Sequence, residues 1–361
     1  MSEKILMKGN EAIAYGAIRC GCDGYFGYPI TPQSEVMETL MEQQPWESTG
    51  MVVLQAESET ASINMLYGGA ATGKMVMTSS SSPGISLMCE GLSYLAGAEL
   101  PCLVVNVMRG GPGLGTIQPS QADYFQCVKG GGHGDYRMIV LAPASVQDMY
   151  DFVEKGFSLA FKYRIPAMIL ADGVVGQMME KVEIGEAKAR RSEGQIEQQC
   201  GQWATTGKKG SRNRNIITSL ALDAPVQEKF NLKLIAKHKT IEENEVICST
   251  YRTEDAEHLI VAYGCMSRIA EAVIDLARAE GYKLGLLRPI TLFPFPKKEI
   301  DALVGQVRSI LTIELSAGQM VEDVRLVVNG RVPVNFYGRY GGMVPSPDEI
   351  FEEFKKSIKL Q

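Results

Sequence analysis

Several patterns that mark common metal sites are missing from this sequence. None of the eight cysteines belongs to a C-x-x-C pair, and only Cys20 and Cys22 are close, with C-x-C spacing. The usual patterns of iron–sulfur clusters and zinc ribbons are therefore absent, and we expect no metal site on this chain. Several cysteines lie in apolar stretches such as LPCLVV, which predicts buried, reduced thiols.

The sequence also lacks long apolar runs and an excess of basic residues. No apolar stretch approaches the roughly 18 residues that span a bilayer, and the N-terminal MSEKILMKGNEA has no secretory h-region. The net charge is −6 and the sequence pI is about 5.4, so no nucleic-acid-binding surface is expected. We therefore expect a cytoplasmic protein without membrane or nucleic-acid partners.

The motifs of several enzyme classes are absent as well. Without a G-x-S-x-G elbow or an H-E-x-x-H helix, hydrolase and metalloprotease chemistry has no support. The glycines after Met108 resemble a dinucleotide fingerprint only superficially, because Pro112 intervenes and no GxGxxG follows a strand near the start of a βαβ unit. His133 lies in a Gly-rich segment without a P-loop ending, and a structural role is expected for it, with substrate contact as the alternative.

Alternating apolar and helical segments predict an α/β protein with two domains. The first domain, residues 1–185, is expected to hold a mostly parallel sheet covered on both faces, with strands near 25–30, 51–54, 74–78, 102–108, 138–141 and 167–170. The polar segment 186–250 is expected to be a connection with one or two helices that wraps a neighbour. A smaller α/β domain, 251–361, should follow, with strands near 258–263, 283–287, 309–313 and 332–336.

Ligands of open parallel sheets bind beyond the carboxyl ends of the strands, so the loops after these runs are the candidate sites. In YPITPQSE, Thr31 is expected to cap a helix that starts at Pro32. Such a helix start either binds an anion or is merely capped. In QAESE, Glu57 and Glu59 point about 200° apart on a helix, so if one is solvated the other faces the protein.

Two further loops carry polar side chains. The serines from Ser79 to Ser82 follow an apolar strand and begin a helix, which suits polar ligand contact but is weak evidence alone. Arg109 leaves the end of the apolar strand LVVNVM. A guanidinium at that place needs an anionic partner, and its planar fork fits a carboxylate.

Together these segments resemble one enzyme family. YPITPQSE, QAESE, TSSSSPG, NVMRGGPG and IQPSQADYFQ are similar to segments of the alpha subunits of 2-oxoacid:ferredoxin oxidoreductases. The resemblance continues through LADG, LLRPITLFPFP, ELSAGQMVEDVR and NFYGRYGG, and so covers nearly the whole chain. QAESE, SSSSPGISLM and GGGHGDYR most resemble the branched-chain type, which acts on 3-methyl-2-oxobutanoate (2-ketoisovalerate).

The resemblance implies a fold and roles for individual residues. Residues 1–185 would form a pyrimidine-type thiamine-diphosphate-binding domain, and 251–361 a transketolase C-terminal-like domain that serves subunit packing. Glu59 would be the catalytic glutamate, whose carboxyl group bonds the pyrimidine ring nitrogen and favours the imino tautomer that removes the thiazolium C2 proton. The other implied cofactor contacts are Pro29, Ile30, Ser81 and Ser82, and the implied substrate-carboxylate contacts are Thr31 and Arg109.

The resemblance also implies partners and a reaction. Mg²⁺ and the diphosphate would lie on a beta subunit, 4Fe-4S clusters on other subunits, and gamma and ferredoxin-like delta subunits would complete the complex. The implied reaction is oxidative decarboxylation of a branched-chain 2-oxo acid to its acyl-CoA and CO2, with electrons passed to ferredoxin in anaerobic metabolism. The alternatives are the same reaction on 2-oxoglutarate or pyruvate, or a non-catalytic scaffold, which the presence of Glu59 disfavours.

Overall fold

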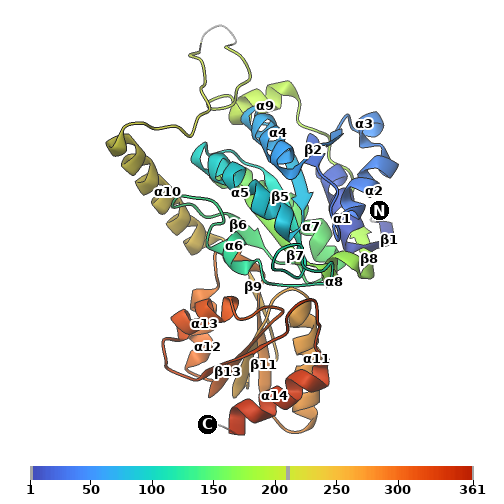
Figure 1. Ribbon diagram of the computed structural model, residues 1–361, viewed down its shortest axis with the longest axis vertical. Helices are drawn as coiled ribbons and strands as arrows, with labels where there is room; N and C mark the ends of the chain where they lie inside the picture. The colour runs from blue at the N-terminus through green and yellow to red at the C-terminus, as the bar shows by residue number, and fades with distance from the viewer. Residues whose placement is uncertain (1–2, 209–211, 360–361) are drawn as a thin grey trace.

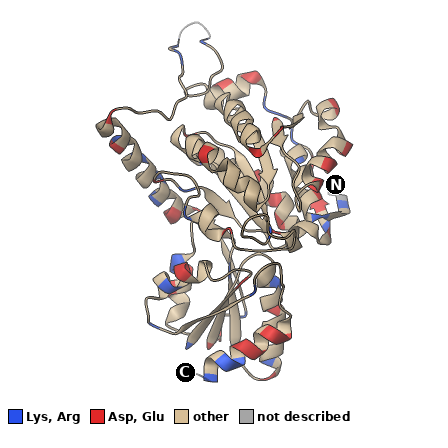
Figure 2. Ribbon diagram, viewed as in Figure 1, with Lys and Arg blue, Asp and Glu red and all other residues tan. Residues whose placement is uncertain are grey.

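The computed structural model describes residues 3–208 and 212–359. Two α/β units follow one another along the longest axis, the larger at the top of Figure 1 and the smaller at the bottom. The α/β fold class predicted from the alternating pattern is confirmed. Acidic and basic residues are interspersed along the ribbon of both units (Figure 2).

The larger unit is built on a seven-stranded sheet of order β12-β6-β7-β5-β4-β2-β3. All of its strands run parallel except β12, which pairs antiparallel with β6. Strands β4 to β7 are buried at every position, because helices cover both faces of the sheet. The strands are β2 (Gly24–Gly27), β3 (Val52–Gln55), β4 (Val76–Ser80), β5 (Leu103–Met108), β6 (Ile139–Leu141), β7 (Ala167–Asp172) and β12 (Thr291–Phe293).

Helices α4 (Glu59–Ala71) and α5 (Ser82–Gly97) pack together on the face turned toward the viewer in Figure 1. On the other face α1 (Gly9–Arg19) packs against α2 (Glu35–Gln43) and α7 (Val146–Tyr163). Short helices complete the unit: α3 (Pro45–Ser48), α6 (Tyr124–Val128) and α8 (Gly173–Gln177).

The strand order places a switch point at the carboxyl edge of this sheet. From β2 the chain moves outward to β3 and then returns to β4 on the other side of β2. The connections that leave β2 and β4 therefore run in opposite directions. Such switch points are where open α/β sheets bind ligands.

Some elements differ from the sequence prediction. Helix α2 begins at Glu35 with Ser34 as its N-cap, so the prediction that Thr31 caps a helix starting at Pro32 was wrong. The amide of Asn10 donates to the carbonyl of Pro32 at 2.6 Å, and the buried Gln33 side chain donates to the carbonyl of Tyr28 at 3.1 Å. These distant partners hold the segment as a turn instead of a helical first turn.

An antiparallel pair of strands was also missed. Strand β1 (Glu3–Lys8) pairs with β8 (Met179–Ile184), which lies far along the sequence. Strand β12 comes from the second unit yet completes the first sheet. A pairing of this kind leaves little local signal, because the partner strand supplies the register.

The connecting segment contains α9 (Glu193–Cys200) and α10 (Ala224–Asn244), which confirms the expected one or two helices. That this segment wraps a neighbour remains a prediction. The boundaries expected at 185 and 250 also remain predictions, and strand β9 (Cys248–Tyr251) begins before the second of them.

The smaller unit has a five-stranded sheet of order β14-β13-β10-β11-β9, with β9 antiparallel. Its C-terminal helix α14 was not predicted; Phe351 and Phe354 bury its apolar side, while acidic and basic residues lie at its first and last turns (Figure 2). The remaining elements are β10 (His258–Val261), α11 (Cys265–Ala279), β11 (Leu284–Pro289), α12 (Lys297–Val304), β13 (Ser309–Glu314), α13 (Met320–Val328), β14 (Val334–Gly338) and α14 (Pro347–Lys359). No helix in the described part of the chain combines the length and apolarity needed to cross a bilayer.

Candidate active site

The candidate site residues come together at the carboxyl edge of four neighbouring strands. Arg109 follows β5, Ser81 follows β4, Thr31 lies in the turn after β2, and Glu59 opens the helix after β3. Because β5, β4, β2 and β3 are adjacent and parallel, their ends meet along one edge. The sequence separated these residues by up to eighty positions, and the topology makes them neighbours.

Glu59 lies in the first turn of α4, where Ser58 caps the helix by accepting a hydrogen bond from the backbone N–H of Ala61 at 3.1 Å. Glu59 is 7% exposed and Glu57 is exposed. Glu57 precedes the N-cap, so the helical geometry from which one of the two was expected to face the protein does not apply to this pair. No residue in the described ranges donates a hydrogen bond to the Glu59 carboxylate. A mostly enclosed carboxylate without a protein partner is suited to a ligand.

Gly84 packs directly against that carboxylate. A Cβ at Gly84 would lie 2.8 Å from Glu59 Oε1 and 2.0 Å from Ser80 Oγ, so no side chain fits there. The hydroxyls of Ser80 and Ser81 are buried and have no hydrogen-bond partner among the described residues. The close packing at the start of α5 therefore brings the carboxylate of Glu59 next to the unused hydroxyl of Ser80.

The neighbouring serines are already engaged. Ser79 donates to Gln33 Oε1 at 2.5 Å and lies 2.7 Å from the Tyr25 hydroxyl. Ser82 donates to Asp123 Oδ2 at 2.6 Å and accepts from the backbone N–H of Arg109 at 3.0 Å. The hydrogen bonds of Ser82 are thus internal, and its predicted contact with a cofactor, like that of Ser81, stays a prediction.

The turn after β2 exposes Thr31 and Pro29 and half-buries Ile30. Below it, Glu35 accepts hydrogen bonds from Gln177 at 2.8 Å and Asn10 at 2.9 Å, and forms an ion pair with Lys8 at 3.2 Å. Burial alone would raise the pKa of Glu35, but these hydrogen bonds outweigh it and lower the pKa. This cluster fixes the position of the turn that carries Thr31.

Arg109 is 9% exposed, and its guanidinium reaches the same turn. Nη1 donates to the carbonyl of Thr31 at 2.9 Å and Nη2 to the carbonyl of Leu114 at 3.1 Å, while Nε is buried without a partner. The two predicted substrate residues are therefore in contact. No acidic side chain of the described ranges pairs with this cation, so the anion that the sequence predicted is left to a ligand.

An open cleft of about 470 Å³ lies beside Arg109, between the start of α5, the Gly-rich loop and α6. Its lining includes Pro83, Ser86 and Gly110 to Leu114, together with Asp123 and Gln126. Sequence reasoning missed Asp123, which lies within the quoted segment IQPSQADYFQ. Nothing local marked it, because its partners Ser82 and Asn106 are 41 and 17 residues away.

His133 lies away from the residues of the candidate site. Its carbonyl accepts a hydrogen bond from Ser93 Oγ at 2.7 Å, and its ring meets the Tyr94 ring edge-on at 6.3 Å. Both contacts are in the second half of α5, away from the first turn that carries Ser82. This placement favours the structural role over substrate contact.

The smaller unit supports the loop that follows Arg109. Gly342 packs so closely that a Cβ there would lie 2.2 Å from Cβ of Gln118. Gln121 is fully buried and donates to the carbonyl of Tyr263 at 2.9 Å, while its side-chain oxygen accepts from the N–H of Leu315 at 3.0 Å. At the end of β7, Asp172 accepts from the N–H of Cys265 at 2.8 Å. The two units thus meet beside the candidate site.

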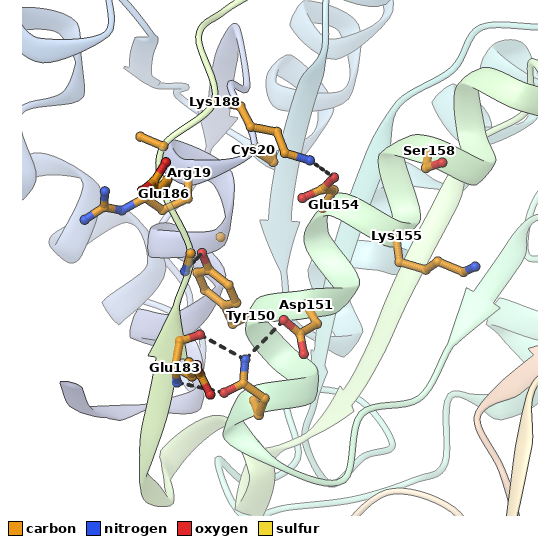
Figure 3. Close-up of a pocket in the computed structure, with 14 residues that line it drawn as sticks. Arg19, Cys20, Tyr150, Asp151, Glu154, Lys155, Ser158, Glu183, Glu186 and Lys188 are labelled. Carbon is orange, nitrogen blue, oxygen red and sulfur yellow. Dashed lines mark hydrogen bonds and ion pairs between the residues drawn. The ribbon is translucent and has the colours of Figure 1, made fainter. Parts of the chain in front are cut away.

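A larger hollow, about 1100 Å³, opens between α1, α7 and the segment after β8 (Figure 3). Polar side chains of this hollow bind one another: Lys188 forms an ion pair with Glu154, and the side-chain amide of Gln147 donates a hydrogen bond to Asp151 at 3.1 Å. Cys20 is not a nucleophile there, since burial raises its pKa to about 12. The hollow lies at the end of α1 that leads into the amino end of β2, so it is not the candidate site.

The arrangement at the carboxyl edge fits the aminopyrimidine end of thiamine diphosphate. It supplies a mostly enclosed carboxylate without a protein partner, two unused hydroxyls, and a glycine at the position where a side chain would collide with them. No group of three or more His, Cys, Asp or Glu side chains suited to a metal occurs in the described part of the chain. The fold and this edge define a cofactor-binding subunit of the thiamine-dependent enzymes.

Comparisons with known proteins identify the family. The thiamine-diphosphate-binding model of pyruvate flavodoxin/ferredoxin oxidoreductases matches residues 15–228, and core domain II of pyruvate:ferredoxin oxidoreductase matches residues 256–350. The chain belongs to the 2-oxoacid:ferredoxin oxidoreductase family, as an alpha-type subunit. The family predicted from the motifs is confirmed.

Among its relatives, the chain is 48% identical to ketoisovalerate oxidoreductase subunit VorB of Methanothermobacter marburgensis, over 97% of each chain. It is 37% identical to 2-oxoglutarate synthase subunit KorA of Archaeoglobus fulgidus, over 93% of this chain and 95% of that one.

Solved structures agree with the fold. The 2-oxoglutarate:ferredoxin oxidoreductase of Magnetococcus marinus matches with a TM-score of 0.84 and 27% identity, over 98% of this chain. This chain spans 65% of that protein's chain. A split-gene transketolase matches with a TM-score of 0.61 and 12% identity, which supports the fold alone.

Proposed function

We propose that this chain is the alpha subunit of a ferredoxin-dependent enzyme that oxidatively decarboxylates 3-methyl-2-oxobutanoate to the acyl-CoA and CO2. The observation that carries the catalytic part is Glu59, a 7% exposed residue whose carboxylate has no hydrogen-bond donor in the described chain and packs against Gly84 and Ser80. A scaffold that had lost activity would gain nothing from keeping such a group buried.

Glu59 would hold the aminopyrimidine ring by a hydrogen bond between its carboxyl group and a ring nitrogen, and share a proton at that atom. The hydroxyls of Ser80 and Ser81, buried and unpaired, would meet the polar edge of the same ring. When bound, thiamine diphosphate supplies a nucleophilic carbon and an electron sink for the decarboxylation. This chain's part is to orient the ring, exclude water and position the proton.

Arg109 would receive the carboxylate of the 2-oxo acid, with Thr31 beside it. Its Nε is buried and unused, and its two terminal nitrogens each have only a neutral carbonyl as a partner. A carboxylate would complete the hydrogen bonding of this cation in a place that water hardly reaches.

Two observations support the proposal that the substrate has a branched, uncharged side chain. Identity is higher to the ketoisovalerate relative, 48%, than to the 2-oxoglutarate relative, 37%. The cleft beside Arg109 has no second cation in its described lining, and it includes the carboxylate of Asp123. The carboxylate of Asp123 would repel a second substrate carboxylate, such as that of 2-oxoglutarate.

Partner subunits complete the proposal. Three exposed apolar side chains lie on the elements before, at and after Glu59: Leu54 on β3 is 41% exposed, Met65 on α4 37% and Leu87 on α5 59%. Exposed apolar side chains of this kind suit a protein partner that would exclude water from the site. That partner would be the beta subunit carrying diphosphate and Mg²⁺, with a gamma subunit and a 4Fe-4S-bearing, ferredoxin-like delta subunit completing a cytoplasmic complex served by coenzyme A and ferredoxin.

Purification of the assembled complex tests the proposal. Viologen reduction dependent on coenzyme A should be fastest with 3-methyl-2-oxobutanoate in a panel that includes 2-oxoglutarate and pyruvate. Reduction with 2-oxoglutarate alone would contradict the substrate, and reduction with no 2-oxo acid would contradict the enzyme.

A further inference from the structure

Asp123 lines the same cleft as Arg109 and is the other charged residue in the described lining, and its role is still open. It precedes α6, and most of its side chain is enclosed between the ends of β4, β5 and α6. Burial raises the pKa of Asp123, although hydrogen bonds from Ser82 and Asn106 oppose that rise. A carboxylate retained in such surroundings needs a structural or functional reason.

One oxygen of this carboxylate links the start of α5 to β5. Asp123 Oδ2 accepts from Ser82 Oγ at 2.6 Å and from Asn106 Nδ2 at 2.9 Å. The amide oxygen of Asn106 accepts in turn from the backbone N–H of Ser82 at 3.1 Å. Asp123, Asn106 and Ser82 therefore form a closed ring of hydrogen bonds.

Ser82 connects this ring of hydrogen bonds to the backbone of Arg109. A hydroxyl has one hydrogen, and Asp123 at 2.6 Å competes for it with the carbonyl of Arg109 at 3.2 Å. The shorter, charge-assisted bond takes the hydrogen. A lone pair of Ser82 Oγ is then aimed at the backbone N–H of Arg109, which donates to it at 3.0 Å.

The two residues that follow Asp123 link this ring of hydrogen bonds to the smaller unit. Directly after Asp123, the hydroxyl of Tyr124 donates to Asp323 at 2.6 Å and the N–H of Phe125 donates to Gln319 at 2.7 Å, both at the start of α13. Asp123 is thus held from the side of the smaller unit and holds the strand end from which Arg109 projects.

We propose that Asp123 is a positioning residue for substrate capture, which acts through Ser82 to fix the backbone at Arg109 and so aims the guanidinium at the carboxylate of the 2-oxo acid. This inference rests on the proposed function. It also assigns to the smaller unit a role in substrate binding besides subunit packing, because α13 anchors the segment that carries Asp123.

The test uses the assembled complex and the variants D123A and D123N, with the exposed D348A on α14 as the matched control. D123A should raise KM for the best 2-oxo acid about tenfold to hundredfold, with kcat within about threefold of wild type. D123N keeps an oxygen that accepts from both Ser82 and Asn106, so it should stay within about threefold to fivefold. Exchange of the cofactor's C2 proton, measured without substrate, should stay within about twofold in every variant.

Each outcome of these measurements either supports the inference or overturns it. An unchanged KM in D123A overturns the inference, and so does an equal defect in D123N and D123A, since the retained hydrogen-bond geometry would then not matter. A parallel loss of C2 exchange would indicate general damage and would also overturn it. If D123A fails to assemble, D123E replaces it, because the longer side chain misplaces the carboxylate and should raise KM at least about fivefold, while an unchanged KM in D123E overturns the inference. A wild-type complex inactive on every 2-oxo acid would instead overturn the proposed function.

Discussion

Replacing Arg109 by alanine should remove the capture of the substrate carboxylate and leave the cofactor chemistry intact. The guanidinium is 9% exposed and already donates to the carbonyls of Thr31 and Leu114, so it is rigidly held before substrate arrives. Preorganised, charge-assisted hydrogen bonds to a carboxylate are worth about 2–4 kcal/mol in total. Since about 1.4 kcal/mol is a factor of ten, kcat/KM should fall roughly 30-fold to 1000-fold.

Steady-state viologen reduction by the assembled complex measures this loss, with the 2-oxo acid varied over a wide concentration range. R109K is the informative companion, because it keeps the charge but loses the planar fork and should recover only part of kcat/KM. R308A serves as the control, since its side chain is 72% exposed and pairs with Glu257 on the surface of the smaller unit. Equal kcat/KM for R109A and wild type would refute the assignment, and so would an R109A defect confined to C2-proton exchange.

Two further changes test other parts of the structure. G84A should greatly slow C2-proton exchange, because its Cβ would lie 2.0 Å from Ser80 Oγ and 2.8 Å from Glu59 Oε1 and would displace both groups, whereas G305A, with nothing within 4 Å of its Cβ, should behave as wild type; normal exchange in G84A would contradict the role of this packing in holding Glu59. Burial, with Arg137 and Lys237 nearby, lowers the pKa of His238 from 6.5 to about 4, so the protonated ring is disfavoured in the folded chain. Its contribution to stability is therefore present above pH 6.5 and should be lost as pH falls toward 4, by about 1–2 kcal/mol after allowance for partial exposure. Urea unfolding between pH 7 and 4 should show this loss in wild type and not in H238Q, and identical pH dependence in both would count against it.

The sequence was most informative where burial is continuous. Strands β5 and β7 were predicted from apolar runs, broken in β5 only by Asn106, and both are buried along their whole length. The parallel sheet followed from their alternation with helices.

The sequence was least informative where distant partners decide the local structure. Thr31 and Pro32 carry the chemistry of a helix start, yet Asn10 and Gln177 bond the carbonyl of Pro32 at 2.6 and 3.1 Å and hold a turn. Strand β12 could not be assigned to the first sheet, since its partner β6 lies about 150 residues earlier. Local propensity has no access to such contacts.

The candidate site was predicted mainly by resemblance. From the residues alone, Arg109 needed an anion and one of Glu57 and Glu59 had to face the protein, but nothing joined the two loops. The hydrogen bond from Arg109 to Thr31 spans 78 residues, and that from Ser82 to Asp123 spans 41. Only the sheet order brings these segments to one edge.

The measurement that tests the central claim most directly is C2-proton exchange of thiamine diphosphate bound to the complex that carries E59Q. Glutamine fills the same space but cannot share a proton with the ring nitrogen, so assembly should be normal and exchange at least about 100-fold slower than in wild type. Exchange at the wild-type rate in a fully assembled E59Q complex would show that the cofactor is activated by another group, and that Glu59 does not have this role.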